Sequence, residues 1–323
     1  MNSPPAGARS PAIAVRVNSL RREFGAVVAV DQLSFEVRRG ELFGLLGPDG
    51  AGKTTTLRML AGVLRPTAGD AWMAGISVAH DPEGVKPALA YMSQRFGLYT
   101  DLTVRENLEF YADLYEVPVP ERAARLERLF RFSNLEPFQN RLAGKLSGGM
   151  KQKLGLSCAL VHEPEILLLD EPTFGVDPIS RRDLWILVHE MVARGVTVIA
   201  STAYMDEAER FDRVAVLDRG RMLALDTPAR LQARLAGRIG AFRVGNPRAA
   251  RAILEHAPGV RAAAVFGAAL HVVMVPDGDP AARLRDLYAR LAAAGHPVLE
   301  TSPPEPSMED VFIDLVAAEA ETR

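Results

Sequence analysis

The chain has 323 residues, of which 48% are apolar, and its formal net charge at pH 7 is −2. This length predicts one large α/β domain with a smaller one, and the apolar content predicts a packed core rather than general disorder. The near-neutral charge gives no whole-chain case for nucleic-acid binding, so we expect no nucleic-acid partner. The single cysteine, Cys158, excludes an internal disulfide framework and a cysteine-based zinc site, and we expect it in the core.

The first residues, MNSPPAGARSP (1–11), are polar and rich in proline, which predicts a disordered tail without the apolar region of a signal peptide. No stretch reaches the roughly 18 consecutive apolar residues typical of a membrane span. We therefore expect a cytoplasmic protein, in which any association with a membrane comes through a partner.

Strand-like and helix-like segments alternate between Ala12 and about Leu225. The runs EILLLD and VTVIAS contain no polar alternation, which is typical of short strands buried on both faces of a parallel sheet. The expected strands are residues 12–17, 33–37, 41–47, 165–170 and 196–201, and the expected helices are Thr54–Leu64 and Val104–Leu114.

The composition changes after Pro228, where alanine and arginine become dominant. The order strand, helix, two strands, helix, strand predicts a ferredoxin-like α+β domain, followed by a last helix at Met308–Ala318. The expected elements are residues 240–245, 247–257, 260–267, 269–275, 280–295 and 296–301. The predicted domains are therefore 12–235 and 236–323.

The segment GPDGAGKTT follows the expected strand ELFGLL and matches the phosphate-binding pattern G-x4-G-K-[ST]. Its glycines allow backbone N–H groups to surround phosphate oxygens, and the following helix N-terminus adds partial positive charge. Lys53 is expected to reach the β- and γ-phosphates, and the Thr54 hydroxyl is expected to bind Mg²⁺. The predicted phosphate-binding residues are Gly47, Pro48, Asp49, Gly50, Ala51, Gly52, Lys53, Thr54 and Thr55.

The strand in EILLLDEP ends in two carboxylates. Asp170 is placed to hold Mg²⁺, directly or through water, and Glu171 to polarise an attacking water as the catalytic base. The alternative is an ordinary strand that ends in a solvated acidic turn.

A second anion-binding helix start is predicted at LSGGMKQK. Ser147 is a good N-cap, Gly148 and Gly149 leave the backbone bare, and Lys151 and Lys153 follow closely. Taken alone, the segment favours a capped surface helix. Together, the three motifs closely resemble those of ATP-binding-cassette (ABC) ATPases over about residues 12–225.

This resemblance implies a P-loop NTPase cassette with a helical subdomain, with ATP and Mg²⁺ as ligands. It also implies a second cassette as partner, whose signature helix closes over the nucleotide held by the phosphate loop. Phe24 falls where the family stacks an aromatic ring, more often tyrosine, on adenine, and its alternative is a core phenylalanine. Gln94 matches the glutamine that senses Mg²⁺ and contacts the membrane partner, and its alternative is a surface glutamine. Asp177 matches the aspartate that communicates across the dimer, and its alternative is a turn residue before Pro178.

Two positions depart from the family pattern. Asp49 replaces the commoner asparagine of the phosphate loop and adds a negative charge near the phosphates. Ala203 stands where the family has a histidine that contacts the γ-phosphate and the attacking water, and a methyl group cannot stabilise charge there. In one account the chain pairs with a different, complete cassette and hydrolyses ATP slowly at its own site. In the other it forms a homodimer in which Glu171 alone suffices.

The C-terminal segment PSMEDVFIDLV resembles the tail of cassettes that serve ABC-2-type export permeases. This resemblance implies a separate multi-span permease, which would hold the chain at the inner face of the cell membrane, with Gln94–Thr103 as the contact surface. The alternative for this surface is a plain loop. The rival functions are a non-transport ABC ATPase and a nucleotide-gated clamp that binds ATP without hydrolysing it. Little room exists between Gln94 and Ser147 for the coiled coil of many non-transport members.

Overall fold

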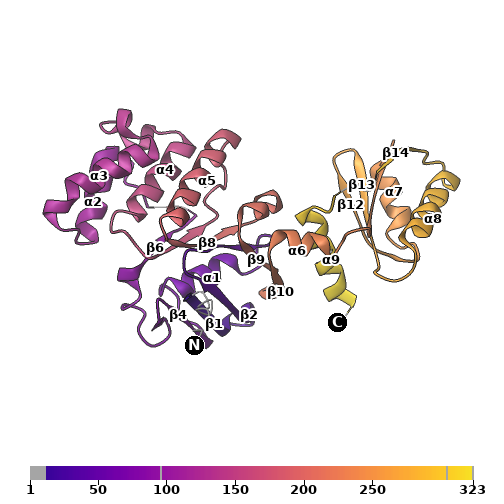
Figure 1. Ribbon diagram of the computed structural model, residues 1–323, viewed down its shortest axis with the longest axis horizontal. Coiled ribbons are helices and arrows are strands. Elements are labelled where there is room, and N and C mark those ends of the chain that lie inside the picture. The colour runs from indigo at the N-terminus through magenta and orange to yellow at the C-terminus, as the bar shows by residue number, and fades with distance from the viewer. Residues whose placement is uncertain (1–11, 95–96, 303–304, 322–323) are drawn as a thin grey trace, which may run out of the picture. The chain divides into compact units, whose positions relative to one another are not determined.

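Figure 1 shows the computed structural model, which describes residues 12–94, 97–302 and 305–321. The predicted tail, residues 1–11, and two residues of the predicted permease surface, Arg95 and Phe96, lie outside this range. The chain forms two compact units, which are described separately. The first contains the residues up to Ala203 together with Arg219–Arg221, and the second contains Tyr204–Asp218 and the residues from Met222 onward. The domain boundary predicted at residues 235–236 stays a prediction.

An antiparallel sheet begins the first unit. Its strand order is β2-β1-β4-β5, and the β1–β2 hairpin closes at the pair Phe24 and Val27 through Gly25, whose φ is 58°. Both long strands extend beyond their predicted ranges, because the pairing between them continues through Leu20 with Leu33 and Arg22 with Val30. The strands are β1 (Ile13–Phe24), β2 (Val27–Arg38), β4 (Ala68–Met73) and β5 (Ile76–Ser77).

A parallel sheet forms the centre of the first unit, with the strand order β3-β8-β7-β6. Every residue of β3, β7 and β8 is buried, which confirms the reading of their unbroken apolar runs. Because the strands are parallel, their carboxyl ends meet at one edge, where ligands bind in open α/β sheets. The strands are β3 (Leu42–Leu46), β6 (Leu89–Met92), β7 (Ile166–Asp170) and β8 (Thr197–Thr202).

Helices α2, α3 and α4 lie together in Figure 1 and share a core that contains Cys158, as predicted. Helix α2 has its predicted bounds and starts with a capping box between Thr103 and Glu106. Helix α1 ends four residues before the predicted Leu64 because Gly62, at φ 68°, stops it. The helices are α1 (Lys53–Leu60), α2 (Val104–Leu114), α3 (Val119–Ser133), α4 (Gly148–Ala159) and α5 (Pro178–Ala193), with short 3₁₀ turns η1 (Lys86–Ala88), η2 (Glu136–Phe138) and η3 (Ala143–Lys145).

The second unit contains the expected ferredoxin-like arrangement. Its antiparallel sheet has the order β12-β13-β11-β14, and helices α7 and α8 pack on it around Phe242, Leu254 and Leu287. The elements are η4 (Met205–Arg210), β9 (Arg213–Asp218), β10 (Arg221–Asp226), α6 (Pro228–Ala233), β11 (Ile239–Val244), α7 (Pro247–Leu254), β12 (Val260–Phe266), β13 (Ala269–Met274), α8 (Pro280–Ala293), β14 (Val298–Ser302) and α9 (Met308–Glu321).

Helix α9 is fixed to the ferredoxin-like sheet by buried charge. Asp310 is fully buried and lies 3.0 Å from Nδ1 of His271, and Asp314 pairs with Arg238 and Arg261 at 3.0 and 3.2 Å. Across the part of the chain that the structure describes, no helix combines the length and apolar character that a membrane crossing requires.

Candidate nucleotide-binding and hydrolysis site

The phosphate loop runs from the end of β3 into α1, and its backbone requires glycine. Gly50 and Gly52 have φ values of 80° and 98°, which side chains strongly disfavour. A Cβ on Gly52 would also lie 2.6 Å from the carbonyl oxygen of Ala29. The first turn of α1 is closed by the Thr56 N–H, which donates to the Gly52 carbonyl oxygen at 2.9 Å. The backbone of this loop thus forms a cradle whose shape depends on its glycines.

Lys53 lies inside this cradle, with its side chain only 4% exposed. Its ammonium group donates to the carbonyl oxygens of Gly47 at 2.7 Å and Pro48 at 3.0 Å. The same nitrogen lies 3.1 Å from Oε1 of Glu171, so the two predicted functional residues form a buried ion pair. A single positive charge is therefore held where the loop would receive phosphate.

Asp170, the last residue of β7, is buried and accepts three hydrogen bonds from hydroxyl groups. Thr54 and Ser201 donate to Oδ1, each at 2.9 Å, and Tyr91 donates to Oδ2 at 3.1 Å. Burial, with the nearby charge of Asp170 adding to it, raises the pKa of Tyr91 to about 12, so this hydroxyl stays a donor. The hydroxyl of Thr54 and the carboxylate of Asp170 are hard oxygen ligands of the kind that Mg²⁺ prefers, and they already lie in contact.

Glu171 is held on both of its carboxylate oxygens. Lys53 contacts Oε1, and Nε2 of Gln94 donates to Oε2 at 3.0 Å. The Glu171 N–H donates to Oγ of Ser201 at 2.9 Å, which supports a backbone with a φ of 47°, uncommon for a residue other than glycine. Such a conformation costs about 1–3 kcal/mol and is typical of functional positions. The structure thus brings together Lys53, Gln94 and Glu171 from three separate elements.

A cavity of about 660 Å³ opens over this group, large enough for a nucleotide. The predicted residues Asp49 through Thr55, Gln94 and Glu171 line it, together with Val27, Val28, Ala29, Phe174 and Arg219. Phe24 is not among the lining residues in the described part of the chain. Its ring is 47% exposed at the end of β1, beneath the guanidinium of Arg22 at 4.5 Å, so the alternative of a core phenylalanine is wrong.

Ser147, Gly148 and Asp177 form a second group, away from the residues that line this cavity. Ser147 caps α4 by accepting from the Met150 N–H at 3.3 Å, and both Ser147 and Gly148 are exposed. Gly149 is buried, and a Cβ there would lie 2.2 Å from the Cβ of Ser180. Asp177 caps α5 by accepting from the Ser180 N–H at 3.0 Å, a bond that lowers the pKa of Asp177. The helix start predicted at Ser147 is therefore exposed at Ser147 and Gly148, whereas Gly149 packs against α5.

Besides the apolar lining residues, three residues with polar side chains at the site were not predicted: Tyr91, Ser201 and Arg219. Ser201 supports both Asp170 and Glu171, and the parallel register that pairs it with Asp170 could have revealed it as a polar residue within an apolar strand. Tyr91 carried no comparable signal, and Arg219 reaches the cavity from a turn distant in sequence. Ala203 follows β8 directly and is half-buried, and its methyl group brings no polar atom to the carboxyl edge of the sheet.

The fold and the site define a nucleotide-binding P-loop domain with the arrangement of an ABC cassette. The family model described as "ABC transporter" matches residues 30–174. The chain is 42% identical over 308 residues to the probable multidrug ABC transporter ATP-binding protein YbhF of Escherichia coli, covering 94% of this chain and 52% of that protein. It therefore spans about half the length of that relative.

Another relative matches almost from end to end. The Nod factor export ATP-binding protein I of Paraburkholderia xenovorans is 35% identical over 312 residues, which cover 96% of this chain and 99% of the relative. A solved structure of an ATP-binding subunit of an ABC transporter aligns with a TM-score of 0.62 at 32% identity, covering 69% of this chain and 93% of that one. The chain belongs to the family of ABC transporter ATP-binding proteins.

Proposed function

We propose that this chain is the ATP-binding and ATP-hydrolysing subunit of an export system. In this proposal it works at the cytoplasmic face of a membrane and powers a separate ABC-2-type permease. The observation that carries the proposal is the buried ion pair of Lys53 and Glu171 in the lining of one cavity, with Asp170 hydrogen-bonded to Thr54 of the same lining. The export systems in the names of the relatives support the transport part of the proposal.

The loop residues bind the triphosphate through backbone N–H groups and Lys53. Arriving phosphates compete for the ammonium group of Lys53, so its contact with Glu171 weakens and the carboxylate is released. Glu171 then accepts a proton from the attacking water. Thr54 and Asp170 are the residues that would hold Mg²⁺, and when bound this ion neutralises charge on the phosphate oxygens. Gln94 keeps the other Glu171 oxygen in place at 3.0 Å.

The exposed start of α4 supports a second cassette as the partner of this chain. Ser147 and Gly148 lie at the surface and do not line the chain's own cavity, so they are available to the nucleotide of another cassette. The double variant Asp49→Cys/Ser147→Cys tests this by crosslinking. Cys158 gives little background because it is buried and burial raises the pKa of its thiol.

An ATP-dependent covalent dimer of the purified double variant supports a homodimer. A crosslink that forms only with a co-expressed second cassette supports the unequal pair. The absence of any crosslink with either partner would contradict the sandwich and favour the non-transport alternatives. The single variants Asp49→Cys and Ser147→Cys are the matched controls, because neither should crosslink alone across the proposed interface.

The permease contact is proposed at the helical part of the first unit. Tyr99, 44% exposed, begins a chain of ring contacts that continues through Phe110 and Tyr111 at centroid distances of 4.5 and 5.4 Å. Leu114 is 60% exposed beside this chain, on the same helix α2. Partly exposed aromatic and aliphatic side chains of this kind are typical of interface cores. Co-purification with a multi-span membrane protein tests the proposal. Tyr99→Ser should reduce the amount of membrane protein that co-purifies, and Tyr288→Ser, at another exposed tyrosine, should not.

Ala203 limits the expected rate of the chain's own site. The purified chain should hydrolyse ATP slowly, and pairing with a complete cassette should accelerate turnover. Phosphate release by the wild-type chain alone and with its co-expressed partner tests this part of the proposal. Rapid hydrolysis by the isolated chain would contradict the unequal pair, and no hydrolysis in any assembly would favour the nucleotide-gated clamp.

A further inference from the structure

A second cavity of about 400 Å³ lies at the opposite edge of the parallel sheet from the nucleotide cavity. It is lined by the residues just before three strands: Arg39 before β3, Glu165 before β7 and Val196 before β8. Asp170, at the other end of β7, belongs to the nucleotide site. A five-residue strand spans about 17 Å, and the two cavities share no lining residue, so they are separate sites.

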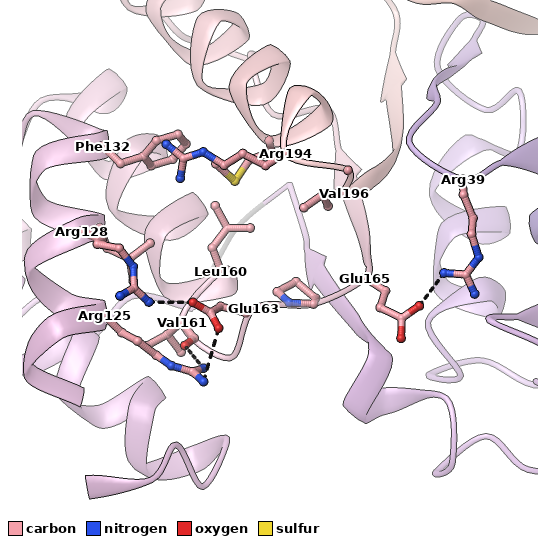
Figure 2. A pocket seen from close by; sticks show the side chains of 14 residues that line it. Arg39, Arg125, Arg128, Phe132, Leu160, Val161, Glu163, Glu165, Arg194 and Val196 are labelled. Carbon is pink, nitrogen blue, oxygen red and sulfur yellow. Dashed lines mark hydrogen bonds and ion pairs between the residues drawn. The ribbon is translucent and has the colours of Figure 1, made fainter. Parts of the chain in front are cut away.

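The lining combines an apolar floor with a cationic rim, as Figure 2 shows. Leu160, Val161 and Met191 are buried and form part of the floor, and Phe132 closes one side. Four arginines and two glutamates line the cavity, which leaves an excess of two positive charges. The rim residues are Arg39, Arg125, Arg128, Glu163, Glu165 and Arg194.

Most of these arginines are already fixed in place. Arg125 and Arg128 contact the two oxygens of Glu163 at 3.3 and 2.7 Å, and Arg39 pairs with Glu165 at 2.8 Å. Arg194 is different: among the residues that the structure describes, its side chain forms a long 3.8 Å ion pair with Glu190 and contacts the ring of Phe132, whose centroid lies 5.6 Å from the guanidinium carbon. The side chain of Arg194 is 60% exposed. It therefore lies over an aromatic ring with most of its N–H donors facing solvent.

We propose that this cavity binds a small anionic amphiphile, with its acidic head at Arg194 and Arg128 and its apolar body on Leu160 and Val196. The volume is within the range of sites for small molecules. An arginine recognises carboxylate through paired N–H donors, and the apolar floor gains from being covered. A metal cation does not fit this combination, because the arginine-rich rim repels it.

The wall of this cavity includes the segment Glu163–Glu165, which connects the Ser147 helix α4 to strand β7 with its terminal Asp170. A bound anion would compete with Glu163 for Arg128 and would therefore contact the connection between the two nucleotide-binding groups. The ligand site itself stands independently of the proposed function, because its residues take no part in the nucleotide cavity.

Calorimetric titration of the full chain with octanoate, and with octanol as the uncharged analogue, tests the proposal. Octanoate should bind saturably at one site, and Arg194→Ala should weaken it about tenfold, since one charged contact is lost. Arg131→Ala, an exposed arginine of the same helix as Arg128 but outside the cavity, should bind like wild type. Equal binding of octanol, or no loss in Arg194→Ala, would overturn the proposal.

The anionic amphiphile could come from a free acid or from a lipid. Sedimentation with phosphatidylglycerol vesicles distinguishes the sources: binding that Arg194→Ala abolishes and octanoate displaces would assign the cavity to a lipid. Saturable octanoate binding without vesicle binding would assign it to a free acid. Binding of neither probe would refute the site. A saturating concentration of ATP should leave octanoate binding to the wild-type chain unchanged and so separates this site from the nucleotide site.

Discussion

The central strands β7 and β8 lie next to each other and end at the same edge of the sheet with very different chemistry. At the end of β7, Asp170 accepts three hydroxyl hydrogen bonds and Glu171 is held on both oxygens. At the end of β8, the Ser201 hydroxyl donates to the Asp170 carboxylate and accepts from the Glu171 N–H, and Ala203 adds only a methyl group. The contrast teaches that this chain holds its acidic residues with several hydrogen bonds but brings only a methyl group to the end of the neighbouring strand.

The largest expected effect comes from removing the carboxylate of Glu171, directly after β7. Glu171→Gln keeps the shape and the contact with Gln94 but cannot accept a proton, so ATP hydrolysis in the assembled complex should fall by about 10²–10⁴-fold. Nucleotide binding should persist. Phosphate release measures the first quantity, and titration with a fluorescent nucleotide measures the second. Glu190→Gln, an exposed glutamate on α5, is the matched control, and equal losses in both variants would contradict the role of Glu171.

The next effect concerns the buried ion pair. Lys53→Met leaves Glu171 without its cation in a site where both side chains are less than a tenth exposed. Breaking such a pair typically costs about 3–5 kcal/mol, which chemical denaturation would detect as a lower unfolding midpoint. The double variant Lys53→Met/Glu171→Gln should recover most of this loss, because no charge is left alone. Lys145→Met, at an exposed lysine, should be neutral; a double variant no more stable than Lys53→Met would argue against the pair.

The next prediction concerns Ala203, directly after β8, where a histidine would add the polar side chain that the family pattern has. Ala203→His gives β8 a hydrogen-bond donor where charge develops during hydrolysis, and the rate at this chain's own site should rise about tenfold. Ala203→Leu adds bulk without a polar atom and should give no increase. An unchanged or lower rate in Ala203→His, together with a rapid wild-type rate, would show that the position is not limiting.

The smallest effect is expected at Tyr91 of β6, whose hydroxyl supports Asp170 at the end of β7. Tyr91→Phe removes one of the three hydroxyl donors to Asp170 and should lower the free energy of unfolding by about 1 kcal/mol. Tyr111→Phe, which removes a hydroxyl bonded to the Gly97 carbonyl oxygen, should cost a similar amount without affecting the nucleotide site.

The pKa of Tyr91 also makes the stability of the fold depend on pH. Its pKa rises from 10 to about 12 on folding, so the native state keeps a proton that the unfolded chain loses in this interval. Its stabilising contribution is complete below pH 10 and declines as pH rises toward 12. The unfolding free energy of wild type should therefore fall more steeply over that interval than that of Tyr91→Phe. Parallel pH profiles would contradict the assigned burial of the hydroxyl.

Much of this fold could be predicted from local patterns. The unbroken apolar runs identified β7 and β8, the glycine-rich loop identified the start of α1, and the alternation after Pro228 identified the ferredoxin-like unit. Helix ends were less predictable, as α1 shows, because a glycine in the left-handed region ended it within a favourable helical sequence.

The contacts within the site could not be predicted in the same way. Lys53 and Glu171 were each assigned to the nucleotide, yet they pair with each other across a long stretch of sequence. Ser201 and Tyr91 act through hydroxyls that point at Asp170 only once the strands are in register. The second cavity joins residues of four segments, none of which forms a local motif.

The most direct test of the account compares the ATP affinities of two variants of the buried ion pair, Glu171→Gln and Lys53→Met, with that of wild type. If phosphates displace Glu171 from Lys53, then Glu171→Gln should bind ATP more tightly than wild type, because Lys53 is no longer neutralised. Lys53→Met should bind ATP about tenfold or more weakly, because the cation is lost. Opposite shifts measured by titration under identical conditions would support the account, and equal affinities in wild type and Lys53→Met would contradict it.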